Sequence, residues 1–201
     1  KLKKNKKKIK NILCVGFFSN IKNQMLLYKA WCNVVKKNEC TLTFVGKKKI
    51  LNYYLSESQI YKKIIKDAKS RKIFDKIKFI NHSNKMHLLY NQSDVFVLPS
   101  QSEGMPNSLL EAMSCNLPCI TTNLKNITSQ IIINKKNGYL FKNNSQKDLE
   151  KYLFKLLRSN SLRNLIGNRA RSHIEKKYSF KKNIYKYEKM YSLVSQQNLS
   201  N

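Results

Sequence analysis

The sequence lacks the features that mark membrane-spanning proteins and disulfide-stabilised secreted proteins. It has no uninterrupted apolar run of about 18 residues, the length that crosses a bilayer as a helix, so any membrane contact is expected to be peripheral. The five cysteines are odd in number and lie in apolar stretches, with no C-x-x-C pair followed by a second pair. This pattern predicts buried, reduced thiols in a cytoplasmic protein without a zinc site.

Acidic residues are also scarce. The chain has 11 aspartates and glutamates and 40 lysines and arginines, which gives a formal net charge of +29. Such an excess occurs in proteins that bind nucleic acids or anionic membranes. Lysine dominates and accompanies many asparagines, isoleucines and tyrosines, which share A/T-rich codons, so base composition of the gene is an alternative explanation. No nucleic-acid motif or set of stacking aromatic residues accompanies the charge, so we expect no nucleic-acid partner.

Short apolar segments alternate with segments of helical periodicity along the chain. Strands are predicted at residues 11–16, 41–46, 76–80, 94–99, 118–122 and 138–141. Helices are predicted at residues 24–37, 57–69 and 86–91, and throughout the tail from residue 145. The alternation predicts one α/β domain whose parallel sheet is covered by helices on both faces. Ligands in such folds bind beyond the carboxyl ends of the strands, here in the loops after Val15, Ile80 and Pro99.

The segment SEGMPNSLLEAMSCNLPC, residues 102–119, places Glu103 and Glu111 just after a predicted strand. Ser108, three residues before Glu111, matches a capping box, which would give Glu111 a structural role. The residues SLLEAMSC, 108–115, are predicted to be helical. Asn116, in the left-handed region, and then Pro118 predict the end of this helix. The alternative is a ligand site, because amides at a helix start attract phosphate and carboxylates accept hydrogen bonds from sugar hydroxyls. Together these two preferences describe a nucleotide sugar.

The loop after Val15 offers a complementary pair of residues. Gly16 permits close approach of a ligand to the backbone, and the ammonium of Lys22, six residues further on, is placed to meet a phosphate. There is no Walker pattern, and a solvated surface lysine is the alternative for Lys22.

Several segments, taken in order, resemble the C-terminal, donor-binding domain of GT-B glycosyltransferases of the group 1 (family four) class. They are VGFFSNIKN, LTFVG, FINHSNKMHLLYNQSDVFVLPSQSEGMPNSLLEAMSCNLPCITTN and NGYLF, followed by a tail that looks like the closing helices of that domain. The resemblance runs from about residue 11 to residue 194. It implies a Rossmann-like parallel sheet, one half of a GT-B fold, that binds a UDP- or GDP-sugar as donor substrate without a cofactor or metal.

The resemblance also implies roles for individual residues. Glu103 would face the hydroxyls of the donor sugar, Lys22 would neutralise the diphosphate, and these two are the implied catalytic residues. Glu111 would hold the ribose hydroxyls, and the loop at Asn81 and His82 would border the base. The full set of implied donor-binding residues is Gly16, Lys22, Asn81, His82, Glu103, Gly104, Met105, Pro106, Asn107, Ser108, Leu109 and Glu111.

The chain departs from the family pattern at a few positions. Phe17 stands where the family usually has an arginine, which removes one charge-assisted contact. Asn23, Asn81 and Asn116 stand where glycine is common, and asparagine tolerates left-handed conformations better than most residues. The stretch NLKN, residues 123–126, replaces one that often ends in two glycines. A non-catalytic, degenerate nucleotide-sugar-binding domain is therefore the alternative to an enzyme.

The resemblance further predicts how the chain is organised and what it meets. Residues 1–10 would be a basic linker from an N-terminal GT-B domain, 11–176 the nucleotide-sugar-binding domain, 177–195 a closing helix and 196–201 a tail. The expected activity is retaining transfer of a hexosyl group to a polysaccharide, oligosaccharide or lipid-linked acceptor, incomplete without the N-terminal domain. The expected location is the cytoplasm, with peripheral contact to the inner face of the membrane through the basic surface. Surface or packing roles are expected for His87 and His173.

Overall fold

The structure is a computed structural model that describes residues 9–46, 55–81, 83–178 and 184, with the backbone alone at residues 55–58. The predicted linker over residues 1–10 and the predicted closing helix over residues 177–195 lie largely outside the described residues.

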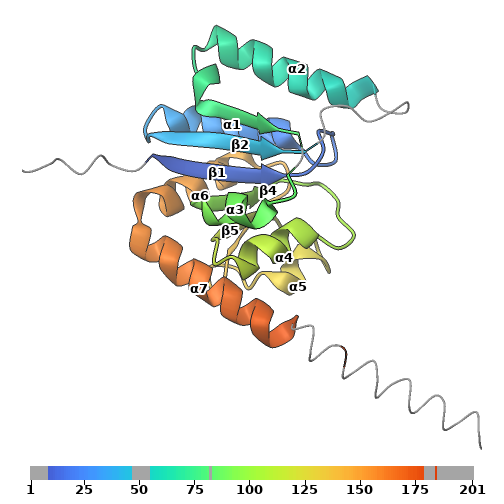
Figure 1. Cartoon of the computed structure of the whole chain (residues 1–201), viewed down its shortest axis with the longest axis vertical. Helices are drawn as coiled ribbons and strands as arrows, with labels where there is room; N and C mark the ends of the chain where they lie inside the picture. Colours follow the sequence, from blue (N-terminus) through green and yellow to red (C-terminus); the bar gives the residue numbers. More distant parts are fainter. Residues whose placement is uncertain (1–8, 47–54, 82, 179–183, 185–201) are drawn as a thin grey trace, which may run out of the picture.

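Six parallel strands form one sheet in the order β3-β2-β1-β4-β5-β6 (Figure 1). The strands are β1 (Lys10–Val15), β2 (Cys40–Val45), β3 (Ile77–Ile80), β4 (Val95–Leu98), β5 (Cys119–Thr122) and β6 (Tyr139–Phe141). They confirm the predicted strands and the α/β, Rossmann-like class. The strand order reverses between β1 and β4, which makes the carboxyl edge between these two strands the expected ligand crevice.

Helices cover both faces of the sheet, as predicted. They are α1 (Gln24–Val35), α2 (Leu55–Ser70), α3 (Met86–Asn91), α4 (Asn107–Ser114), α5 (Thr128–Ile131), α6 (Gln146–Arg158) and α7 (Asn160–Lys177). Helices α1, α2 and α6 pack on one face, and α3, α4, α5 and α7 pack on the other (Figure 1). The short α5 and a 3-10 helix at Phe74–Lys76 were not predicted, because single turns leave too few residues for a helical period to show.

The side chains of β1 show how the sheet divides the core. Ile12 and Cys14 point to the α1/α2/α6 face, whereas Leu13 joins the cluster under α3, α4 and α7. All three are at most 2% exposed. Because successive residues of a strand alternate between faces, burial on both sides produces the nearly continuous apolar run seen in the sequence.

The end of α4 is fixed by close packing against α7. Asn116 has φ 58°, which confirms the predicted left-handed position after the helix. A Cβ atom on Gly167 of α7 would lie 1.9 Å from the carbonyl oxygen of Asn116, so only glycine allows this approach. The Asn116 Nδ2 atom also donates to Asn168 Oδ1 at 2.7 Å. Helix α4 is thereby held at a fixed position beside the carboxyl edge.

Candidate functional site

The loops that follow β1 and β4 meet at the carboxyl edge where the strand order reverses (Figure 1). The amide of Gln101, in the loop after β4, donates to the carbonyl of Ile21, in the loop after β1, at 2.7 Å. The β1 loop also lies against the end of β2, since a Cβ atom on Gly46 would be 2.1 Å from the Gly16 carbonyl oxygen. This edge is therefore a compact junction of three strand ends.

An ion pair joins Lys22 of the β1 loop to Glu103 of the β4 loop. Lys22 Nζ lies 2.9 Å from Glu103 Oε1 and 2.8 Å from Oε2, so the ammonium contacts both carboxylate oxygens. The Glu103 side chain is 7% exposed and that of Lys22 is 21% exposed. The structure thus brings together the two residues that the resemblance marked as catalytic, and it pairs them with each other.

A buried glutamine holds the β1 loop in shape. Gln24, at the start of α1, is fully buried; its amide nitrogen donates to the carbonyls of Gly16 and Phe17, and its Oε1 accepts from the amide of Ser19. Ser19 Oγ in turn accepts from the amide of Lys22 at 3.0 Å. Sequence reasoning missed Gln24, although a polar residue opening an amphipathic helix was the available signal. Its bonds fix the point from which Lys22 reaches Glu103.

Phe17, which replaces the arginine usual in the family, lies beside the same ammonium. The centre of its ring is 5.7 Å from Lys22 Nζ, and its side chain is 39% exposed. A ring face stabilises an ammonium modestly but brings no charge of its own. The β1 loop therefore offers one cation at this edge, from Lys22, where the family pattern offers two.

The start of α4 presents open amides but not the predicted capping box. Helix α4 begins at Asn107, and its N-cap, Pro106, makes no side-chain bond. Ser108 accordingly lies inside the first turn instead of at the cap, so the capping-box prediction is wrong. Within the described part of the chain, the amides of Gly104, Met105 and Ser108 donate to no other group. Free amides at a helix start are suited to an anion.

Glu111 has a different partner from the one that the capping box would give it. Its Oε2 atom accepts a hydrogen bond of 2.7 Å from the hydroxyl of Tyr90, the tyrosine of α3. Tyr90 is 2% exposed and its ring packs edge-on against Phe96 of β4. Burial and then the bond to Glu111 raise the pKa of Tyr90, so its hydroxyl stays a neutral donor. Sequence reasoning missed Tyr90, since no local spacing links it to Glu111.

Tyr90 and Glu111 also line a mostly apolar cavity of about 390 Å³ between α3, α4 and the end of α7. Its other lining residues are Met86, His87, Leu110, Ser114, Cys115, Ile174 and Tyr178. The volume falls within the range of small-ligand cavities. Glu111 of α4 is an exposed residue that lines this cavity.

The remaining expected binding residues are placed unevenly. Pro106 and Leu109 are buried, and the Leu109 amide already donates to the Pro106 carbonyl at 2.9 Å. Met105, Asn107 and Asn81 are exposed, the last at the end of β3. His82 lies outside the described residues.

Cys14 lies beneath the ion pair, and burial raises its pKa to about 12, with Lys22 lowering it slightly and Glu103 raising it. A thiol with such a pKa is not a nucleophile near neutral pH. The described residues contain no group of three His, Cys, Asp or Glu side chains that could hold a metal ion. The polar groups of the candidate site include the Lys22 ammonium, the Glu103 and Glu111 carboxylates and the backbone amides before and within the first turn of α4.

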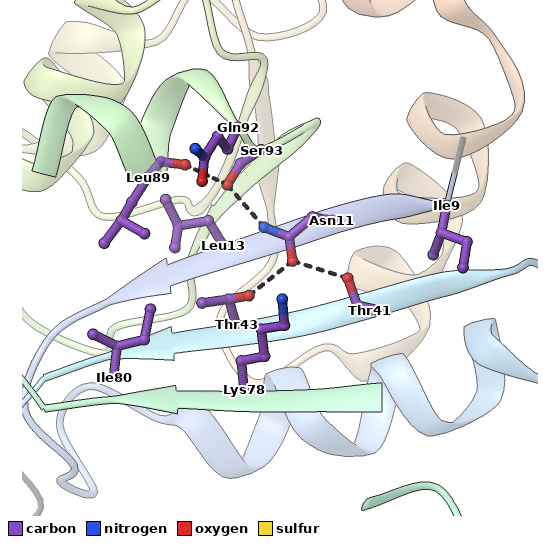
Figure 2. A pocket seen from close by; sticks show the side chains of 10 residues that line it. All are labelled: Ile9, Asn11, Leu13, Thr41, Thr43, Lys78, Ile80, Leu89, Gln92 and Ser93. Carbon is purple, nitrogen blue, oxygen red and sulfur yellow. Dashed lines mark hydrogen bonds between the residues drawn. The ribbon is translucent and has the colours of Figure 1, made fainter. Parts of the chain in front are cut away.

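A second cavity, of about 450 Å³, runs along the sheet face over β1, β2 and β3 (Figure 2). It exists because α3 has 6 residues, roughly 9 Å of helix, and covers only part of this face. Asn11 Oδ1 accepts from the hydroxyls of Thr41 and Thr43, and its Nδ2 donates to Ser93 Oγ at 3.0 Å. These polar groups bond to one another and lie toward the amino ends of β1 and β2, away from the carboxyl edge, so this cavity is not the candidate site.

Fold and site together define an α/β protein with a polar site at the crossover of a doubly wound sheet, where such folds bind nucleotides. The sequence pattern of the family described as "Glycosyl transferases group 1" matches residues 1–173. The chain therefore belongs to this glycosyltransferase family.

Individual relatives agree with this assignment. The chain is 30% identical over 163 residues to an uncharacterized glycosyltransferase of Haemophilus influenzae, covering 81% of this chain and 43% of that protein. It is 33% identical over 110 residues to the UDP-Gal:alpha-D-GlcNAc-diphosphoundecaprenol alpha-1,3-galactosyltransferase of Escherichia coli, covering 54% of this chain and 27% of that enzyme. The chain thus spans less than half the length of these two relatives.

Solved structures show the same fold. The C-terminal domain of LpcC, a group 1 glycosyl transferase family protein of Francisella tularensis, superimposes with a TM-score of 0.76 at 23% identity, covering 85% of this chain and 87% of that domain. Anabaena HepE in complex with UDP-glucose gives a TM-score of 0.80 at 15% identity, covering 90% of this chain and 48% of that one. At these identities the likeness establishes the fold, which is that of one Rossmann-like half of a GT-B glycosyltransferase.

Proposed function

We propose that this chain is the donor-binding half of a glycosyltransferase and that it holds a UDP- or GDP-sugar at the carboxyl edge between β1 and β4. In this proposal the open amides before and within the first turn of α4 receive the diphosphate, together with Lys22. Glu103 accepts hydrogen bonds from the sugar hydroxyls, and Glu111 accepts them from the ribose.

The observation that carries the proposal is the ion pair of Lys22 and Glu103. It lies beside the amides before and within the first turn of α4 that donate to no group in the described part of the chain. Each partner has the charge that one part of a nucleotide sugar needs, a cation for the diphosphate and a carboxylate for the hydroxyls. In the free chain they neutralise each other. Donor binding would exchange one ionic contact for two better matched ones, without leaving either charge unpaired in a largely buried place.

The chemistry follows from where charge develops. When the bond between the anomeric carbon and the phosphate oxygen breaks, negative charge grows on the leaving diphosphate, next to Lys22 and the α4 amides. The proposed reaction is transfer of a hexosyl group, with retention, to a glycan or lipid-linked acceptor. Relatives point this way in their names, since the Escherichia coli enzyme uses UDP-Gal and a diphosphoundecaprenol-linked sugar.

The acceptor would be supplied through a second, N-terminal GT-B domain. Phe17, Ile21 and Met105, which lie in the two loops that carry the ion pair, are 39%, 54% and 63% exposed. Exposed apolar side chains around a polar site are typical of a surface that another domain covers. We therefore expect the 201-residue chain to bind donor but to show no normal turnover by itself.

Calorimetric titration with UDP, GDP and the corresponding glucose and galactose conjugates tests the proposal. We expect one saturable site for one of the two bases, with affinity that falls when Glu111 is changed to glutamine. Heat that appears equally with any anion, including inorganic sulfate, would contradict it.

Phe17 favours a second candidate, a nucleotide-sugar-binding domain without catalysis, because it removes a cation from the diphosphate site. The distinction lies in turnover of the natural full-length protein. Transfer of labelled sugar from the donor that calorimetry identifies supports the enzyme, whereas donor binding without transfer or hydrolysis supports the second candidate.

The basic surface adds a proposed location, the cytoplasm with peripheral attachment to an anionic membrane. Among the described residues no helix is long and apolar enough to cross a bilayer. The net charge of +29 would be attracted to acidic headgroups. Sedimentation with vesicles tests this: we expect binding to phosphatidylglycerol vesicles at low salt, and equal binding to neutral phosphatidylcholine vesicles would contradict it.

A further inference from the structure

We infer that Tyr90 is a positioning residue of the donor site, which acts by directing the carboxylate of Glu111. The inference rests on the proposed function, because it concerns the carboxylate assigned there to the ribose. It assigns to a side chain of α3 a role that neither the local sequence around Glu111 nor a helix cap provides.

The geometry of Tyr90 makes it a rigid donor. The residue is 2% exposed, and the centre of its ring lies 6.0 Å from that of Phe96, with the rings inclined at 64°. Packing on β4 therefore fixes the place of the hydroxyl. A buried tyrosine hydroxyl requires a partner, and this one reaches Glu111 Oε2 at 2.7 Å.

The bond to Tyr90 fixes the orientation of the Glu111 carboxylate. Glu111 is exposed, and an unrestrained glutamate loses side-chain entropy when a ligand orders it. The bond to Tyr90 orders the side chain before any ligand arrives, which is the general route by which preorganisation improves affinity. A hydroxyl supplies a single proton, so the other carboxylate oxygen stays open to a ligand.

The neutrality of the partner matters as much as its position. A lysine or arginine in place of Tyr90 would cancel the charge of Glu111, as Lys22 does for Glu103. A tyrosine hydroxyl is neutral near pH 7, and burial followed by the bond to Glu111 raises the pKa of Tyr90 further, so this donor brings no positive charge to the carboxylate.

The chain contains a matched control on its other face. Tyr28 of α1 is also 2% exposed, and its hydroxyl donates to Asp67 Oδ2 at 2.6 Å. Asp67 is held in addition by Arg71, whose Nε lies 2.6 Å from the same oxygen. Tyr28→Phe removes the same chemical group from an equally buried place on the opposite face of the sheet.

The first arm of the test measures UDP affinity by calorimetry, or GDP affinity if that base is preferred, with the melting temperature followed in parallel. We expect Tyr90→Phe to weaken affinity roughly fivefold, the effect of one ordinary hydrogen bond. In a Glu111→Gln background the same change should have no further effect on affinity. Unchanged affinity in Tyr90→Phe, or an equal loss with and without Glu111, would overturn the inference, as would an equal loss in Tyr28→Phe.

The second arm reads the bond without any nucleotide. In protein labelled with ¹³C at glutamate carboxyl groups, the Glu111 resonance is identified by its loss in Glu111→Gln. It should shift in Tyr90→Phe at neutral pH and stay in place in Tyr28→Phe. If the chemical shift of the Glu111 resonance were unchanged in Tyr90→Phe, the inference would be overturned. If the wild-type chain bound neither UDP nor GDP, the proposed function would fail, and this spectrum would still decide whether Tyr90 directs Glu111.

Discussion

Two glutamates eight positions apart in the sequence have opposite surroundings in the structure. Glu103, in the loop after β4, is 7% exposed and meets a cation, with both oxygens within 2.9 Å of Lys22 Nζ. Glu111, on α4, is exposed and meets the neutral hydroxyl of Tyr90 through one oxygen. The charge of the Glu103 carboxylate is therefore neutralised by its partner, whereas the Glu111 carboxylate is only oriented by its partner.

This difference indicates how the two carboxylates would respond to a ligand. In the proposed function, Glu103 would have to exchange its partner before binding a sugar, and a diphosphate is the group that would draw Lys22 away. Glu111 would need no exchange, because its other oxygen has no hydrogen-bond partner among the described residues. Substitutions at the Lys22–Glu103 pair should consequently affect stability as well as affinity, whereas substitutions at Glu111 should affect affinity alone.

The largest expected effect is on stability. Lys22→Met leaves the carboxylate of Glu103 nearly buried without its cation, and removing one partner of such a pair destabilises a fold by about 3 kcal/mol. Urea unfolding monitored by circular dichroism measures this loss. The double change Lys22→Met with Glu103→Gln should recover much of it, and strictly additive losses would show that the two side chains are not coupled.

The second effect is on affinity. Glu111→Gln should weaken UDP or GDP binding about ten- to thirtyfold, as expected for hydrogen bonds to a charged group, and leave the urea midpoint unchanged, because Glu111 caps no helix. Glu150→Gln on α6 is the matched control, since Glu150 also accepts hydrogen bonds, from Asn33 and Gln146. If Glu111→Gln lowered the urea midpoint and left the affinity unchanged, the role of Glu111 would be structural.

A smaller effect should follow from adding charge beside Lys22. Phe17→Arg places a second cation at the proposed diphosphate site and should strengthen UDP or GDP binding roughly fivefold at low salt, less at higher salt. The control is Phe74→Arg. Phe74 is similarly exposed, at 37%, and the centre of its ring lies 5.5 Å from Lys69 Nζ. Equal gains in both variants would indicate a general charge effect and not a diphosphate site.

The smallest effect distinguishes the cysteines of the two regions. Burial raises the pKa of Cys14, beneath the ion pair, to about 12, so almost no thiolate is present at pH 8. Burial also raises the pKa of Cys115, but this thiol lines the cavity next to Glu111. Iodoacetamide followed by mass spectrometry should label Cys115 slowly, faster as pH rises, and leave Cys14 intact. Labelling of Cys14 first would mean that the edge under the ion pair opens readily.

The sheet was predictable from the sequence, whereas the partners at the site were not. Strands such as CTLTFV carry their own signal, because a buried parallel strand needs an apolar run. Lys22 and Glu103 are 81 residues apart in the sequence, and their approach requires the strand order, which places β1 next to β4. The capping box was a sound local inference about Glu111, but Tyr90, 21 residues earlier in the chain, supplies the partner instead. Contacts of that kind follow from packing and have no sequence spacing of their own.

The most direct test of the account is a crystal structure of the chain with UDP, or with GDP if calorimetry selects that base. We predict that the diphosphate lies at the α4 amides, that Lys22 Nζ moves from Glu103 to a phosphate oxygen, and that Glu111 bonds at once to Tyr90 and to the ribose. A nucleotide bound elsewhere, such as on the sheet face of Figure 2, or one that leaves Lys22 within 2.9 Å of both Glu103 oxygens, would contradict it.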